Sequence, residues 1–187
     1  PVAEEQSFSV LSDGTFYCVY RTIDGYSACT YSDDGGHTWT EPQYKTYPDG
    51  RRLKNPRAAN FAWRCANGKF LYWFHNHGGR QIVEHPQRRT ASYQDRNPVW
   101  LSAGVEVDTP QGKRLHWSQP EIALYDDDPY VRMSYPDLIE ADGKIYLSET
   151  QKFIDRSHEI DAELLDGMWA SFTAKEKTTA GLALELE

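Results

Sequence analysis

Three short turns of the Asp-Gly or Asn-Gly type constrain the fold of this chain more than any other feature of its sequence. They are Asp13-Gly14, Asn67-Gly68 and Asp142-Gly143, and each stands between two runs rich in aromatic and β-branched residues. Such dipeptides favour β-hairpins with type I′ turns, which need positive φ at both central positions. The pattern predicts three hairpin units, and their unequal spacing predicts loops inserted between strands.

Helical periodicity is almost absent from the chain. One segment, roughly Ile160 to Phe172, mixes acidic residues with leucines, Met168 and Trp169, and it predicts a single helix that Gly167 weakens. The sequence therefore predicts an all-β protein.

Composition excludes several classes of protein. The net charge is −8 and no block of Lys and Arg occurs, which argues against a nucleic-acid binder. No run of apolar residues is long enough for a membrane-spanning helix. Cys18, Cys29 and Cys65 lack CxxC spacing, so the sequence predicts no zinc site and at most one disulfide. His75 and His77 share one face of a strand, but no third ligand stands at a fixed spacing, so we expect no metal and no cofactor.

The most specific motif is the segment Ser32-Asp33-Asp34-Gly35-Gly36-His37-Thr38-Trp39, which fits the pattern Ser-x-Asp-x-Gly-x-Thr-Trp. An aspartate can accept hydrogen bonds from its own turn, glycines supply unusual φ values, and Trp39 can cover the base of a hairpin. We therefore expect Asp33 and Asp34 to have a structural role rather than a catalytic one, and His37 to be an exposed turn residue.

This motif is the Asp-box of sialidase-type β-propellers, and the chain resembles the sialidase (neuraminidase) superfamily over roughly residues 4–150. The resemblance implies part of a six-bladed β-propeller, of which about three or four blades would fit in this length. We expect residues 1–172 to form this partial propeller. Residues 173–187 would be a linker and the start of a further strand or module, lectin-like by analogy.

The same resemblance implies roles for individual residues. In the family a Glu opens a strand, an Arg ends the next strand before an Asp-box, and a second Arg and a catalytic Tyr follow. Here the matching residues are Glu5, Arg21, Arg96 and Tyr135. Tyr135 would be the nucleophile, Glu5 its base, and Arg21 and Arg96 would bind the carboxylate of the substrate. Glu149 matches the acid that orients an arginine of the cluster.

The chemistry of sialic acid explains these residue types. Its anomeric carbon carries a carboxylate, which arginines can bind bidentately and which would repel a carboxylate nucleophile. A neutral tyrosine avoids that repulsion, but it needs a nearby base because its pKa is near 10. Sialidases with a tyrosine nucleophile are a known exception to the usual scheme of two carboxylates.

Some alternatives remain open at the level of sequence. Arg57, in Asn55-Pro56-Arg57, competes with Arg96 as a ligand. Glu4 competes with Glu5, because neighbouring residues of a regular strand face opposite sides and a shift of one residue would exchange them. Pro136, after Tyr135, departs from the small polar residue that is usual in the family.

The function that the resemblance implies is an exo-α-sialidase-like glycosidase that acts on a glycan or glycoconjugate. The alternatives are a propeller enzyme for another uronic or sulfated glycan, or a carbohydrate-binding propeller without activity. The family's third arginine and its Asp acid/base precede the segment that matches Glu5, so we expect both upstream and expect this chain to be inactive alone. We expect a secreted, periplasmic or cell-surface protein.

Overall fold

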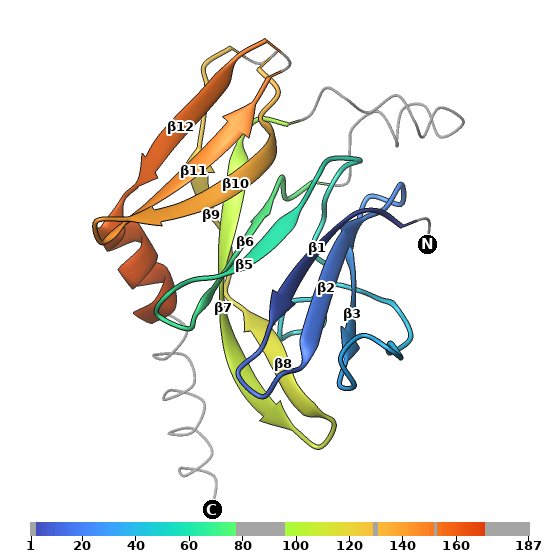
Figure 1. The fold of residues 1–187 in the computed structure, drawn as a ribbon. Coiled ribbons are helices and arrows are strands. Elements are labelled where there is room, and N and C mark those ends of the chain that lie inside the picture. The colour runs from blue at the N-terminus through green and yellow to red at the C-terminus, as the bar shows by residue number, and fades with distance from the viewer. Residues whose placement is uncertain (1–2, 78–95, 129–130, 152, 171–187) are drawn as a thin grey trace, which may run out of the picture.

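The computed structural model describes residues 3–77, 96–128, 131–151 and 153–170. In these residues the chain is all-β apart from one helix over residues 162–170, which confirms the predicted fold class and the predicted helix (Figure 1). Asp161 caps this helix, because its Oδ1 accepts hydrogen bonds from the backbone N–H groups of Glu163 (2.7 Å) and Leu164 (3.1 Å). The segment expected to be a linker, 173–187, lies outside the described residues.

The described strands form three antiparallel sheets in the order of the chain (Figure 1). The first sheet has the order β1-β2-β3-β4: β1 (Glu4–Val10), β2 (Phe16–Arg21), β3 (Ala28–Ser32) and β4 (Gln43–Tyr44). The second has the order β5-β6-β7-β8, and β9 also pairs with β7: β5 (Phe61–Arg64), β6 (Phe70–Phe74), β7 (Val99–Thr109), β8 (Gly112–Trp117) and β9 (Glu121–Leu124). The third has the order β10-β11-β12: β10 (Ser134–Ala141), β11 (Lys144–Thr150) and β12 (Asp155–Ile160).

The three predicted hairpins are all present, but their turns differ from the expected type. At Asp142-Gly143 both residues have positive φ, +52° and +75°, as a type I′ turn requires. At the other two turns only the glycines do, Gly14 at +89° and Gly68 at +77°, so the type I′ prediction is wrong there. At the first of these, Asp13 Oδ1 accepts a hydrogen bond from the N–H of Thr15 (3.0 Å), so a side chain closes the turn in place of a second left-handed residue.

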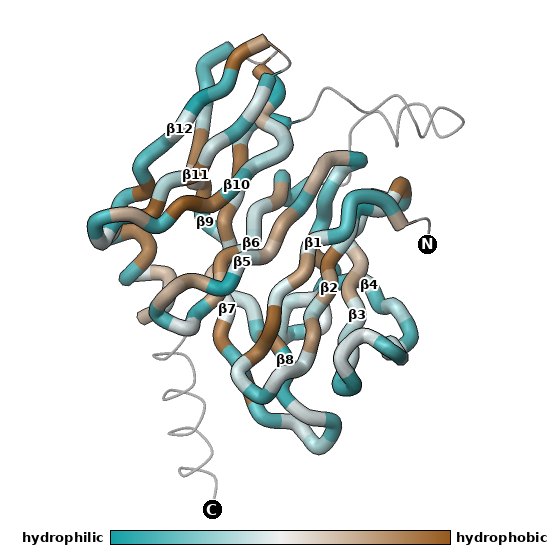
Figure 2. Tube along the Cα trace, viewed as in Figure 1, coloured by the Kyte–Doolittle hydropathy of each residue, from teal (hydrophilic) through white to brown (hydrophobic). Residues whose placement is uncertain are grey.

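Two apolar cores lie between neighbouring sheets. The first joins β1–β4 to β5–β9 and the second joins β5–β9 to β10–β12 and the helix. Packing in the first core is tight at Gly104, since a Cβ there would lie 2.7 Å from the ring of Trp117. Figure 2 shows hydrophobic stretches along the strands and hydrophilic turns at their ends. The sheets therefore hold together by burial between blades, as in a propeller.

A buried lysine lies in the interface between the first two sheets. The Lys45 side chain is almost fully buried, and its Nζ lies 3.5 Å from the ring centroid of Trp117 and 4.1 Å from that of Tyr72. The two rings attract a cation, while burial lowers the pKa of Lys45 well below its usual value.

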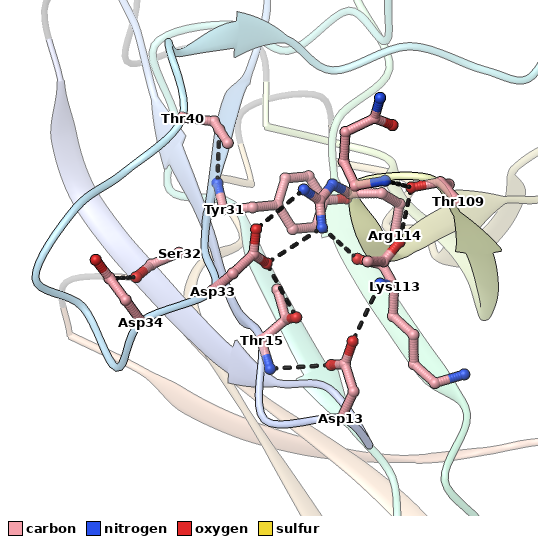
Figure 3. Close-up of polar contacts among 12 residues, drawn as sticks. Asp13, Thr15, Tyr31, Ser32, Asp33, Asp34, Thr40, Thr109, Lys113 and Arg114 are labelled. Carbon is pink, nitrogen blue, oxygen red and sulfur yellow. Dashed lines mark hydrogen bonds and ion pairs between the residues drawn. The ribbon is translucent and has the colours of Figure 1, made fainter.

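The Asp-box forms the connection after β3, and its two aspartates make different contacts. Asp34 accepts hydrogen bonds within the turn, from the Thr38 N–H (2.9 Å), the Thr38 hydroxyl (2.6 Å) and the Ser32 hydroxyl (2.8 Å). Asp33 instead reaches the next sheet, where both of its oxygens lie 3.4 Å from the guanidinium of Arg114 on β8 (Figure 3). The structural role predicted for both residues is confirmed.

Candidate functional site

The residues predicted for the site come from three sheets and gather where several strands begin or end. Glu5 lies at the start of β1 and Arg21 at the end of β2. Arg96 precedes β7, Tyr135 lies at the start of β10, and Glu149 lies near the end of β11. These strand ends lie toward the upper part of Figure 1.

Tyr135 and Glu5 are in direct contact, although 130 positions separate them in the sequence. The Tyr135 hydroxyl donates a hydrogen bond of 3.0 Å to Glu5 Oε1. About half of the Tyr135 side chain, 52%, remains exposed, so the phenol is open to a ligand from one side. A phenol that donates to a carboxylate is the arrangement in which the carboxylate can remove its proton.

Both members of this pair lie in irregular backbone. Glu5 has φ +53° and Tyr135 has φ +46°, values that residues with a side chain rarely adopt. Each lies at a β-bulge, the first between Glu4 and Gln6 and the second between Ser134 and Asp137. Pro136 lies within the second bulge and has no N–H to donate to the ladder. Strained backbone and bulges of this kind are common at functional sites, because they redirect side chains.

The bulge on β1 brings two neighbouring carboxylates to one arginine. Arg21 Nε donates to Glu4 Oε2 (3.0 Å), and Arg21 Nη1 lies 2.9 Å from Glu5 Oε2. In a regular strand Glu4 and Glu5 would point to opposite faces, and the sequence-based choice between them assumed that alternation. The structure places both beside Arg21.

Arg57 and Arg96 both lie in the cluster, so their position alone does not decide which of them is a ligand of the substrate. Arg57 forms a two-pronged ion pair with Glu4, from Nη2 to Oε1 (2.6 Å) and from Nε to Oε2 (3.0 Å). Arg96 is buried, donates from Nη1 to the Ser134 hydroxyl, and donates from Nη2 to the backbone carbonyl of Arg57 (3.2 Å). Hydrogen bonds from Arg57 and the two nearby positive charges hold the pKa of Glu4 below its usual value.

These contacts close into a ring, which we call the polar ring, that joins the first and third sheets to the connections before β5 and β7. Its members are Glu4, Glu5, Arg21, Arg57, Arg96, Ser134 and Tyr135. Two carboxylates and three guanidiniums leave an excess of one positive charge. A cluster with that excess suits a ligand that carries one negative charge.

Glu149 is fully buried but holds a different arginine from those in the polar ring. Its Oε1 accepts from Arg156 Nε (2.6 Å), and Arg156 Nη1 also binds Asp126 Oδ2 (2.8 Å). Glu149 and Arg156 face each other directly on β11 and β12, which explains the pair. The role expected for Glu149, orienting an arginine of the carboxylate-binding cluster, stays a prediction.

His75, one of the two histidines considered as metal ligands, lies in buried surroundings. His75 is buried and its Nδ1 lies 3.2 Å from the carbonyl of Pro98, close to Arg96. Burial lowers the pKa of His75 to about 3, so the ring is neutral. Across residues 3–77, 96–128, 131–151 and 153–170, no group of three or more His, Cys, Asp or Glu side chains is placed to hold a metal ion.

Reasoning from the sequence missed Ser134 and the joint use of Glu4 and Arg57. The acidic doublet at the start of a strand and the arginine directly after Pro56 were visible signals. What could not be read from them is the bulge that turns both acids to the same side. The thiols of Cys18, Cys29 and Cys65 are free in the structure.

A family model and several solved structures match this chain. The family of BNR repeat-like domains matches residues 3–147. A comparison with curated protein sequences found no match. In the part of the chain that is described, no helix is long and apolar enough to cross a membrane.

Three solved structures share the fold. The intramolecular trans-sialidase from Ruminococcus gnavus, in complex with oseltamivir carboxylate, has a TM-score of 0.59 and 20% identity, over 86% of this chain and 33% of that one. The leech intramolecular trans-sialidase has a TM-score of 0.54 and 18% identity, over 83% of this chain and 22% of that one. A mutant of NanB sialidase from Streptococcus pneumoniae has a TM-score of 0.53 and 16% identity, with the same coverages, 83% and 22%. The chain thus spans a third or less of the length of these proteins.

Proposed function

Because the chain belongs to the family of BNR repeat-like domains and has the fold of solved sialidases, we propose that it supplies the nucleophile side of a glycosidase site for sialic acid-type sugars. The single observation that carries the proposal is the hydrogen bond of 3.0 Å from the Tyr135 hydroxyl to Glu5, beside an arginine cluster. The solved structures that share the fold are of sialidases, one of them in complex with oseltamivir carboxylate, which supports an acidic sugar as the substrate class.

The reaction follows from the residue types in the polar ring. Arg21 and Arg96 bind the sugar carboxylate and orient the anomeric carbon toward Tyr135. The Tyr135 oxygen attacks that carbon while Glu5 removes the phenolic proton, and the bond to the leaving group breaks. Water then attacks the same carbon and loses a proton to the base that remains after the leaving group was protonated, the bond to Tyr135 breaks, and Glu5 returns the phenolic proton to the phenolate. Two inversions give net retention of configuration.

The leaving group also needs a proton, and the polar ring has no spare acid for it. Its two carboxylates, Glu4 and Glu5, both lie in ion pairs with arginines. The acid would therefore come from a segment outside this cluster, and the inactivity expected of residues 1–187 alone stays a prediction. The acid/base and the third arginine that the resemblance implies upstream remain predictions.

Turnover of a fluorogenic sialoside by the full natural chain that carries this sequence tests the proposal. Tyr135→Phe should abolish release of the sugar and leave the melting temperature unchanged, because the phenol is half exposed. Tyr146→Phe, which removes a phenol from the middle of β11, is the matched control and should retain activity. A fluorinated sialoside should leave the sugar covalently attached to the peptide that contains Tyr135, as peptide mass spectrometry would show.

Other outcomes separate the alternatives. Near-normal turnover in Tyr135→Phe would overturn the nucleophile role. Release of a uronic or sulfated sugar, with none from sialosides, would change the substrate class. Binding of sialosides without turnover by the full chain would indicate a carbohydrate-binding propeller.

A further inference from the structure

The ion pair between Glu4 and Arg57 takes no part in the reaction described above, yet it is one of the contacts that close the polar ring. Arg57 donates to both oxygens of Glu4, at 2.6 Å and 3.0 Å, and Glu4 accepts from Arg21 Nε at 3.0 Å. A two-pronged contact of this kind fixes the orientation of both groups as well as their distance.

The backbone of Arg57 makes the connection to the other arginine. Its carbonyl oxygen accepts from Arg96 Nη2 at 3.2 Å, while its side chain holds Glu4. One residue therefore links Arg21, at the end of β2, to Arg96, ahead of β7. Arg21 ends a strand of the first sheet and Arg96 lies in the connection before β7 of the second, and no strand ladder joins β2 to β7 in the described residues.

We propose that Glu4 and Arg57 are positioning residues that fix Arg21 and Arg96 at the spacing needed to bind one carboxylate. This inference rests on the proposed function, because it assigns the carboxylate of the substrate to Arg21 and Arg96. Arg57 acts through Glu4 and through its own carbonyl. Its guanidinium contacts both oxygens of Glu4, and the proposal assigns it no direct contact with the substrate.

A double-mutant cycle in the full natural chain separates positioning from direct binding. Glu4→Gln and Arg57→Met should each lower kcat/KM roughly tenfold, and the double variant should lose no more than either single one, because both break the same link. A direct ligand would behave differently, since Arg57→Met would then cost a further factor of about ten in the Glu4→Gln background. That additive result would overturn the proposal, and so would full activity in Arg57→Met.

The loss should appear mainly in KM. Arg21 and Arg96 would bind the carboxylate in the ground state and in the transition state alike, so their misplacement weakens binding more than it slows the chemical step. Arg57→Lys keeps a charge near Glu4 and should recover part of the loss. Glu159→Gln, which breaks the exposed ion pair with Lys144 (2.9 Å), is the control and should change neither parameter. A fall in kcat alone would contradict the positioning role.

A second readout does not depend on activity. The Nε–H signal of Arg21 in a nitrogen–proton correlation spectrum, assigned by its absence in Arg21→Lys, reports the hydrogen bond to Glu4. It should shift in Arg57→Met, which does not touch Arg21, as well as in Glu4→Gln, and stay in place in Glu159→Gln. An unchanged signal in Arg57→Met would overturn the proposal. A natural chain that cleaves no sialoside but shows this shift would instead overturn the proposed function alone.

Discussion

Carboxylates lie in irregular backbone at both ends of the sheet β1–β4. At one end they bind neighbouring residues, and at the other they bind residues far away in the sequence. At the Asp-box end, Asp34 accepts from a hydroxyl and an N–H only four residues ahead. At the other end, Glu4 and Glu5 contact Arg21 of the same sheet, Arg57 in the connection before β5, and Tyr135 of the third sheet. The first arrangement closes a turn and needs only local sequence. The second assembles a charged cluster, and it depends on the whole fold.

The largest expected difference between the two ends is in how a substitution there affects catalysis. Glu5→Gln should lower kcat at least about a hundredfold, because the amide cannot take the phenolic proton from Tyr135. The melting temperature should hardly change. Turnover of a fluorogenic sialoside by the full natural chain, with a thermal melt of the same sample, measures both. A strongly lowered melting temperature would show that Glu5 is needed for the fold, as Asp34 is at the other end.

The corresponding change at the Asp-box end should affect stability and leave substrate binding intact. Asp34→Ala removes the acceptor for the N–H and hydroxyl of Thr38, so the melting temperature should fall by several degrees while KM stays constant. Asp34→Asn keeps one acceptor oxygen, so its melting temperature should fall less than that of Asp34→Ala. A changed KM with an unchanged melting temperature would reverse the assignment of the two ends.

The two ends should also respond to acid in different ranges of pH. In the native state burial lowers the pKa of His75, beside Arg96, to about 3, whereas an unfolded histidine gains a proton below about pH 6.5. The unfolded state therefore binds more protons between these values, and the unfolding equilibrium should shift toward the unfolded state up to tenfold per pH unit as pH falls. His75→Asn should flatten this decline between pH 6.5 and pH 4.5 in denaturant titrations.

At the Asp-box end the protein should lose stability only at a lower pH. Hydrogen bonds from Thr38 and Ser32 hold the pKa of Asp34 well below its usual value of 3.8, so its contribution is present above that pH and is lost only as pH falls further. In Asp34→Asn the decline below about pH 3.8 should be shallower than in the natural sequence. A loss of stability near pH 6 that disappears in Asp34→Asn would contradict the assignment.

The smallest effect concerns the contact that ties the Asp-box to the next sheet. Both oxygens of Asp33 lie 3.4 Å from Arg114, at the long end of the range for an ion pair, and Asp33 is half exposed. The guanidinium of Arg114 also lies over the ring of Tyr31, 4.5 Å from its centroid. Arg114→Met keeps a long side chain over this ring and should cost about 0.5 kcal/mol or less in the free energy of unfolding. A much larger loss, seen by denaturant titration, would mean that this contact holds the two sheets together.

The contrast between the ends also explains what could be predicted from the sequence. The hairpins, the helix and the Asp-box depend on residues a few positions apart, so composition and turn chemistry predicted them. The resemblance to a family was needed to select Glu5 and Tyr135, which are far apart in the chain. The shared use of Glu4 and Glu5 could not be predicted, because strand alternation assigns them to opposite faces and only the bulge at Glu5 removes it. The type I′ prediction failed at Gly14 for a related reason, since Asp13 closes that turn through its side chain.

The polar ring has a consequence for the order in which the protein folds. Each Asp-Gly or Asn-Gly hairpin can close early, because its strands are joined by a few residues and the entropy cost of the loop is small. The contact between Glu5 and Tyr135 closes a loop of 130 positions and needs the first and third sheets to be docked against the second. The contacts of Glu4 and Glu5 with Arg21 lie within the first sheet, but the polar ring is complete only when all three sheets have docked.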